Sequence, residues 1–352
     1  MSMRIWAFLI GQRVDARTGF DEIYRNLLAD AELAEGLGYH GVLVAEHHFT
    51  NYCAIPNPLM LAAALGQRTT RIRIGTAVVV LPLHHPVRLA EDIAQADRLT
   101  GGRLEVGLGR GYAPYEFAPF GLDLASSAAV VGEALEVLER LWGGVDVSGE
   151  DGRWPFPPLT VTPRPVQRPR PPVWYACGSA GSFALALDRG LFPFIAVGVR
   201  GRAFVEEYRG RFEAECRARG VDPGSIRFGA QLLAHHGRDR DEVERAARAA
   251  RLMYRMTARL AAGTQRVRAG LVDLTGTEPA ADVPTEQIVS GSLIGDDDHI
   301  RRQLAWLEGL GVTDLSLNFR YGDLDTASVR RSMERVAELA GLRAGGGSAP
   351  VA

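Results

Sequence analysis

Apolar runs alternate with amphipathic segments along nearly the whole chain. Eight short runs have the continuous apolar character of buried strands: Arg4–Ile10, Gly41–Ala45, Ile72–Leu81, Leu104–Leu108, Pro172–Ala176, Phe192–Val197, Ile226–Ala234 and Thr313–Phe319. Between them, apolar residues recur at helical spacing: Asp21–Leu37, Val87–Leu99, Ala129–Trp142, Arg202–Arg219, Arg240–Leu260, Ile300–Leu310 and Ser328–Ala340. This alternation predicts an α/β fold of the TIM type, a (β/α)8 barrel, with a doubly wound open sheet as the alternative.

Three segments interrupt the alternation. The proline-rich stretch Trp154–Pro172 predicts an extended loop before the fifth strand. Residues Ala261–Ser290 form a long insertion after the seventh strand and its helix, and we expect it to be a mobile lid. The segment Gly345–Pro350 has the composition of a flexible linker. We therefore expect one barrel domain, residues 1–342, followed by a disordered tail, residues 343–352.

Composition excludes several kinds of partner. The chain has 352 residues, of which 46% are hydrophobic, and its formal net charge is −2. It therefore lacks the basic field of a nucleic-acid-binding protein, and no apolar run is long enough to span a membrane. The amino terminus has no signal-peptide layout, so we expect a cytoplasmic protein. The scattered Cys53, Cys177 and Cys216 form neither a disulfide framework nor a metal-binding pair, and we predict no metal site.

Lysine does not occur in this sequence, so all 40 basic residues are arginine. A Schiff-base nucleophile, a pyridoxal-phosphate anchor, a P-loop lysine and a kinase-type lysine are thereby excluded. A phosphate group would have to be held by arginine, hydroxyl groups and backbone N–H groups.

Two histidine pairs follow predicted strands. His47 and His48 come after Gly41–Ala45, and His84 and His85 follow the next strand. Barrel active sites are built at the carboxyl ends of strands, and histidine titrates near neutral pH, so we expect a site that handles protons. Packed or surface histidines are the structural alternative. A metal-dependent hydrolase is a third possibility, although neighbouring strand residues point to opposite faces, so each pair can send only one imidazole inward.

Two further segments could hold a phosphate group. The turn from Gly107 to Tyr112 lacks the third glycine of a dinucleotide-binding fingerprint, but it offers backbone N–H groups beside Arg110. After the fifth strand, Gly178, Ser179 and Ser182 lead into a helix that starts near Phe183, where free N–H groups and hydroxyls can meet an anion. Separately, these are a tight turn and a helix cap. Together, at one end of a barrel, they favour a bound phosphate.

Several motifs resemble those of the bacterial luciferase-like flavin monooxygenase family. The resemblance extends from about Met3 to about Leu342, and it is carried by Glu46-His47-His48-Phe49, Gly75–Pro82, His85–Asp92, Gly102-Arg103 and Gly109-Arg110-Gly111. It implies a homodimeric barrel that receives reduced FMN from a separate flavin reductase. It further implies that oxygen is activated as a flavin 4a-hydroperoxide, which oxygenates a small organic substrate.

The resemblance also assigns residues. His47 matches the histidine that acts as acid and base toward the flavin adduct, and Glu46 lies beside the flavin. Ala77 and Val78 match a non-prolyl cis peptide beneath the isoalloxazine ring. The remaining expected cofactor-binding residues form the phosphate cradle or follow the fifth strand: Arg110, the backbone of Tyr112 and Ala113, Ala176, Gly178, Ser179 and Ser182.

Two positions differ from the luminous members of the family. Gly109 replaces a reactive cysteine, and Gly178 replaces a carboxylate of the phosphate site. The sequence therefore resembles a non-luminous monooxygenase more closely than a luciferase. A deazaflavin-dependent hydride-transfer enzyme on the same barrel, and a non-catalytic flavin-binding subunit, remain as alternatives.

Overall fold

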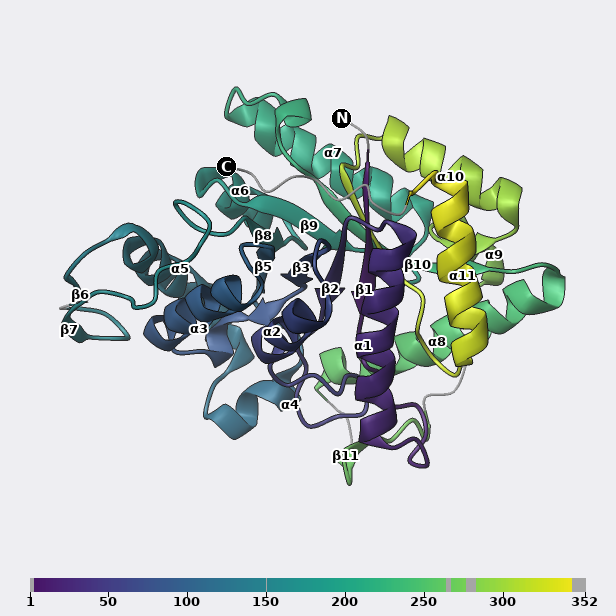
Figure 1. Cartoon of the computed structure of the whole chain (residues 1–352), viewed down its shortest axis with the longest axis horizontal. Coiled ribbons are helices and arrows are strands. Elements are labelled where there is room, and N and C mark those ends of the chain that lie inside the picture. The colour runs from purple at the N-terminus through teal and green to yellow at the C-terminus, as the bar shows by residue number, and fades with distance from the viewer. Residues whose placement is uncertain (1–2, 150, 264–266, 277–282, 344–352) are drawn as a thin grey trace.

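A closed barrel of parallel strands forms the centre of the molecule (Figure 1). The structure, a computed structural model, describes residues 3–149, 151–263, 267–276 and 283–343. The barrel strands are β1 (Arg4–Leu9), β2 (Gly41–Val44), β3 (Arg73–Thr76), β5 (Leu104–Gly109), β8 (Val173–Ala176), β9 (Phe192–Ala196), β10 (Gly229–His236) and β14 (Asp314–Asn318). Each pairs in parallel with the next, and β14 pairs with β1. The predicted (β/α)8 barrel is confirmed, and the open sheet is wrong.

Helices cover the outside of the barrel. The longer ones are α1 (Phe20–Leu37), α2 (Pro58–Arg68), α3 (Pro86–Leu99), α5 (Ser127–Gly143), α6 (Ala180–Asp188), α7 (Arg202–Ala218), α8 (Arg240–Ala262), α10 (Asp297–Gly309) and α11 (Thr326–Leu339). In α1, for example, Ile23, Leu27, Ala31 and Ala34 recur every three or four residues and are buried, which puts one apolar stripe against the strands. No helix in the described ranges is both long and apolar enough to cross a membrane.

Shorter elements occupy the connections. They are the helices α4 (Pro114–Phe117) and α9 (Thr285–Ser290), the 3-10 turns η1 (Leu81–Leu83), η2 (Ala118–Phe120), η3 (Leu124–Ser126) and η4 (Pro223–Ser225), and the strands β4 (Val79–Val80), β6 (Val147–Gly149), β7 (Phe156–Leu159), β11 (Val267–Arg268), β12 (Leu271–Val272) and β13 (Leu293–Gly295). In Figure 1, β1 descends from the N-terminus, so the carboxyl ends of the strands lie toward the bottom, where α4 and β11 are drawn.

The third predicted strand is not continuous. Residues Ile72–Leu81 divide into β3, a bend at Ala77 and Val78, the two-residue β4 and the turn η1. The backbone leaves the sheet after Thr76 and rejoins it at β4, which pairs in parallel with β5. The N–H of Val80 donates to the side chain of Glu46, which follows β2. An unbroken apolar run does not reveal such a bend, because it looks the same in a buried strand and in a buried turn.

The predicted loops contain some regular structure. Within the proline-rich stretch, β7 pairs antiparallel with β6. Within the predicted lid, β11 and β12 form a small hairpin, and α9 leads to β13, which pairs with β10. Residues 264–266 and 277–282 of the predicted lid lie outside the described residues, as does the predicted tail apart from Arg343. Helix α2 was not predicted, although Asn57 caps it and Pro58 starts it in the usual way.

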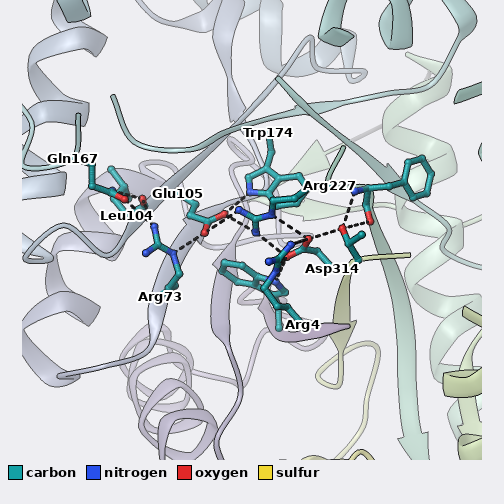
Figure 2. A network of polar contacts seen from close by, with 11 residues as sticks. Arg4, Arg73, Leu104, Glu105, Gln167, Trp174, Arg227 and Asp314 are labelled. Carbon is teal, nitrogen blue, oxygen red and sulfur yellow. Dashed lines mark hydrogen bonds and ion pairs between the residues drawn. The ribbon is translucent and has the colours of Figure 1, made fainter. Parts of the chain in front are cut away.

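Ion pairs close the amino end of the barrel (Figure 2). Arg4 of β1 and Arg227, which precedes β10, both contact the buried Asp314 of β14, each with a guanidinium nitrogen 2.7 Å from its Oδ1. Arg73 of β3 lies 2.6 Å from Glu105 of β5. Charged residues thus fill the end of the barrel opposite the strand exits, which leaves the carboxyl end for a site.

Candidate active site

Small residues form a floor at the carboxyl end of the barrel. Ala77 and Val78 follow β3, and Ala176 and Ala196 are the last residues of β8 and β9. Ala77, Val78 and Ala176 are partly exposed, and Ala196 is exposed. The peptide bond between Ala77 and Val78 is cis, as the family resemblance implies. A Cβ atom at Gly109 would lie 2.6 Å from Cγ2 of Val78, so the valine side chain takes the space that a side chain at position 109 would need. The result is a floor of small, uncharged side chains.

Glu46 is the ionic centre beside this floor. Its side chain is buried, and Oε1 accepts hydrogen bonds from Nε2 of His48 and Nε2 of His84, each at 2.9 Å. Oε2 accepts the backbone N–H of Val80 at 2.8 Å. Burial alone would raise the pKa of Glu46, but the hydrogen bonds from His48 and His84 outweigh it and lower the pKa to about 2. Glu46 is therefore a carboxylate that ties the end of β2 to the bend after β3.

His47 is held by a different carboxylate. Its Nδ1 lies 2.7 Å from Oε1 of Glu116, which is only 1% exposed and also accepts the backbone N–H of His48 at 3.1 Å. The imidazole packs edge-on against Tyr52 and Tyr112, with ring centroids 4.7 and 5.5 Å apart. His47 thus lies in an aromatic wall, which consists of its own ring and those of Tyr52 and Tyr112.

The predicted histidine pairs separate in the structure. His47 turns to Glu116, whereas His48 and His84 share Glu46. His85 is exposed and packs against Trp154, with ring centroids 6.2 Å apart. Among the described residues, no group of three or more His, Cys, Asp or Glu side chains is placed to hold a metal ion. The four histidines therefore do not surround a common centre.

The glycine turn after β5 carries Arg110 outward. Gly111 has a positive φ of 77°, and a Cβ atom there would lie 2.8 Å from both Phe117 and Val80. Arg110 is exposed and makes no ion pair within the described chain, while Tyr112 is 38% exposed and Ala113 is buried. Burial raises the pKa of Tyr175 in the neighbouring β8 to about 12, and the positive charge of Arg110 opposes this shift. The turn therefore offers a free positive charge at the rim of the floor.

The second predicted phosphate element is a capped helix start. The Ser179 side chain accepts the N–H of Ser182, and Oγ of Ser182 accepts the N–H groups of Gly178 and Ser179 at 3.0 and 2.9 Å. Both hydroxyls are thus engaged in the helix cap. The N–H groups of Ala180 and Gly181 lie in the first turn of α6, where backbone N–H groups have no intrahelical acceptor and form the positive end of the helix dipole. A Cβ atom at Gly178 would meet nothing within 4 Å, so the approach to this helix end is open.

Sequence reasoning missed Glu116. It lies in Pro114-Tyr115-Glu116-Phe117, where a single acid among apolar residues was the available signal, because a buried acid needs a polar partner. Its partner is 69 positions away, and only the fold brings the two together.

The chain is similar to one protein family and to several solved structures. The family model described as luciferase-like monooxygenase matches residues 3–314. The oxygenase component of flavin-dependent trigonelline monooxygenase from Acinetobacter baylyi is 27% identical over 322 residues, which cover 89% of this chain and 88% of that protein. The crystal structure of monooxygenase RslO1 from Streptomyces bottropensis aligns with a TM-score of 0.82 and 26% identity, over 96% of this chain and 98% of that one. An F420-dependent secondary alcohol dehydrogenase shares the fold, with a TM-score of 0.74 and 16% identity over 96% and 98% of the two chains.

Proposed function

Because the chain belongs to the luciferase-like monooxygenase family, we propose that it is the oxygenase component of a two-component, FMN-dependent monooxygenase. It takes reduced FMN from a separate flavin reductase and transfers one atom of molecular oxygen to a small organic substrate, without light emission. The relative from Acinetobacter baylyi is named as an oxygenase component, which supports the division of labour between two proteins.

The residues present fit FMN. Its phosphate would be held by Arg110, the backbone after it and the start of α6, and its ring system would lie on the floor formed by Ala77, Val78 and Ala176. The observation that carries this proposal is the combination of two features: the exposed guanidinium of Arg110, which makes no ion pair with any described residue, and a floor of small side chains none of which is ionisable. Open space at Gly178 supports it, because a phosphate group needs close approach to the helix N–H groups.

Bound reduced FMN supplies two electrons, so that one oxygen atom enters the substrate and the other leaves as water. The protein contributes proton control and exclusion of water. His47 exchanges a proton with the reacting oxygen, and its place in the aromatic wall limits access of solvent. Glu46 keeps its negative charge and accepts the N–H of Val80, which holds the bend between β3 and β4 against the end of β2.

The hairpin of β11 and β12, a described part of the predicted lid between Ala261 and Ser290, is proposed to cover the site. The backbone N–H of Val272 in β12 donates to Oδ1 of Asn51 at 2.9 Å, and Nδ2 of Asn51 donates to the carbonyl of Arg13 at 2.8 Å. These bonds tie the hairpin to the loops that follow β1 and β2, beside the strand exits. A lid at this place would separate the reacting oxygen from bulk water.

The proposal also includes a single barrel domain over residues 1–342 that works as a homodimer. Closure of the barrel by β1 and β14, which lie at opposite ends of the sequence, supports the single domain. The dimer rests on the family resemblance. Light scattering on the purified protein gives the mass directly, and a monomer at working concentration would remove that part of the proposal.

A rapid-mixing experiment tests the function. Anaerobic protein with photoreduced FMN is mixed with oxygenated buffer while the absorbance of oxidised flavin is followed. We expect the flavin to reoxidise more slowly with the protein than alone, because the site keeps water away from it. The His47→Ala variant should shorten this delay. Reoxidation indistinguishable from that of free FMN would contradict the proposal and favour a deazaflavin-dependent enzyme or a non-catalytic subunit.

A further inference from the structure

The carboxylate of Glu116 defines which nitrogen of His47 carries a proton. Oε1 of Glu116 lies 3.1 Å from the backbone nitrogen of His48, and a backbone N–H can only donate. The same oxygen therefore accepts from His48, and Nδ1 of His47 lies 2.7 Å from it, at the distance at which an Nδ1–H group would donate to the carboxylate. In a neutral imidazole one nitrogen is a donor and the other an acceptor, so Nε2 is left with a free lone pair.

The remaining surroundings of His47 leave Nε2 available. The ring has aromatic neighbours, Tyr52 and Tyr112, which meet it at interplanar angles of 76° and 73°. Among the described residues, no group forms a hydrogen bond with Nε2. The side chain is 11% exposed, so the ring is fixed in place but still reachable from the site.

The neighbouring carboxylate cannot take over this task. Both oxygens of Glu46 are occupied by His48, His84 and the N–H of Val80. Glu116, in contrast, is delivered to His47 by the tight turn at Gly111 and by α4, in which its N–H donates to the carbonyl of Ala113 at 3.0 Å. Its side chain is 1% exposed, so water does not compete for the carboxylate.

We propose that Glu116 is a positioning residue that locks His47 in the Nδ1–H form and leaves Nε2 as the proton acceptor of the site. This inference rests on the proposed function, in which His47 exchanges a proton with the reacting oxygen. A free imidazole in water favours the proton on Nε2, so without Glu116 we expect Nε2 to carry the proton already. When His47 takes a proton, the same carboxylate stabilises the positive ring, as orienting carboxylates do in other enzymes.

Two substitutions separate the acceptor from the charge. Glu116→Gln keeps an oxygen that can accept from both His47 and His48 but removes the charge, whereas Glu116→Met keeps the approximate volume and removes the acceptor. Glu334→Met, at an exposed position of α11, is the matched control. Circular dichroism establishes that each variant is folded, and Glu116→Gln keeps the test informative where Glu116→Met does not fold.

Nitrogen NMR of the flavin-free protein with labelled histidine reports the tautomer directly, with His47→Ala used to assign the signal. We expect the Nδ1–H form of His47 in the wild type and in Glu334→Met, most of it in Glu116→Gln, and a shift to the Nε2–H form in Glu116→Met. An Nε2–H signal in the wild type, or an unchanged Nδ1–H signal in Glu116→Met, would overturn the assignment. Because no turnover is needed, this result does not depend on whether the protein is a monooxygenase.

Turnover adds a second readout. With any accepted substrate, we expect kcat to fall by at least about tenfold in Glu116→Met, less in Glu116→Gln and not in Glu334→Met, because an orienting carboxylate acts on the chemical step. KM for the substrate and the Kd of FMN should stay nearly constant. Equal losses in kcat and in FMN affinity would indicate general damage to the site and refute a positioning role. Absence of oxygenation by the wild type would instead contradict the proposed function.

Discussion

Replacement of Asp314 by asparagine should destabilise the barrel strongly. Asp314 is 2% exposed at the amino end of β14 (Figure 2). Its carboxylate accepts Nε and Nη2 of Arg4 at 2.7 Å each, Nη2 of Arg227 at 2.7 Å and the indole N–H of Trp6 at 3.1 Å. Asparagine has nearly the same shape, so the substitution removes the charge without creating a cavity. It also turns one acceptor into an N–H donor that faces two guanidinium groups.

The expected magnitude follows from the charges that remain. Arg4, Arg73 and Arg227 are balanced in part by Asp314 and Glu105, so the substitution leaves Glu105 as the carboxylate among three guanidinium groups. Removal of one partner of a buried ion pair costs about 3–5 kcal/mol. Arg4 keeps 26% and Arg227 17% of its side-chain surface exposed, and water can stabilise them in part. We therefore expect the free energy of unfolding to fall by about 3 kcal/mol, at the lower end of that range.

Urea unfolding measures this change, with Asp298→Asn as the control. Asp298 also pairs with an arginine, at 3.1 Å from Arg301, but its side chain is 77% exposed. Exposed pairs contribute about 0–1 kcal/mol. If Asp314→Asn and Asp298→Asn shift the urea midpoint equally at unchanged slope, the reasoning from burial is wrong. Unchanged slopes matter because they show that both variants unfold the same surface.

The pH dependence provides an internal check on the same residue. Burial alone would raise the pKa of Asp314, but hydrogen bonds from Arg4 and Arg227 outweigh it and hold the pKa well below its usual value. A carboxyl group with a lowered pKa in the folded state stabilises the protein fully above its unfolded pKa of about 3.9, and this stabilisation is lost as the pH falls below that value. The wild type should therefore lose its advantage over Asp314→Asn in acid.

Three further predictions concern the site. In the proposed function the imidazole of His47 moves a proton and does not hold the cofactor, so His47→Ala should lower turnover by roughly 10²–10⁴-fold while the Kd of FMN changes little. Steady-state kinetics and fluorescence titration check this, and unchanged turnover would remove the proton-transfer role of His47. Arg110→Ala should weaken FMN binding by about 10- to 100-fold through loss of a charge-assisted hydrogen bond, and an equal Kd in the same titration would exclude it from the cradle. Gly109→Cys should lower the melting temperature, because its Cβ would lie 2.6 Å from Cγ2 of Val78 and overpacking costs about 1–3 kcal/mol. Thermal melting curves check this against the control Gly178→Ala, whose Cβ would meet nothing within 4 Å.

The sequence predicted the barrel because its strands are apolar runs of the right length. Gly41–Ala45 is one such run, and β2 covers Gly41–Val44. The pattern failed where an apolar run contains a turn, as at Ile72–Leu81. There the N–H of Val80 donates to Glu46, which lies in another part of the chain. Periodicity records which residues are buried but not which backbone N–H group finds which acceptor.

Polar partners were the least predictable feature of the fold. Arg4 and Asp314 are 310 positions apart, and they meet because β14 pairs with β1 in a register that places these two residues opposite each other. That register exists only once the barrel has closed. The same limit applies to Glu116, whose partner His47 belongs to the exit of another strand. Charged pairs across a closed sheet therefore follow from the fold, whereas the sequence shows only that each charge needs a partner.

The glycine turn after β5 links the two ends of the proposed cofactor site. With φ of 77°, Gly111 reverses the chain so closely that any side chain there would overlap Phe117 and Val80. Arg110, before this glycine, is exposed and makes no ion pair with any described residue, while Glu116, after it, is buried against His47. The spacing between the anion-binding and proton-handling parts of the site is thus set by one tight turn. A side chain larger than hydrogen at position 111 should disturb both parts together, because it cannot move one without the other.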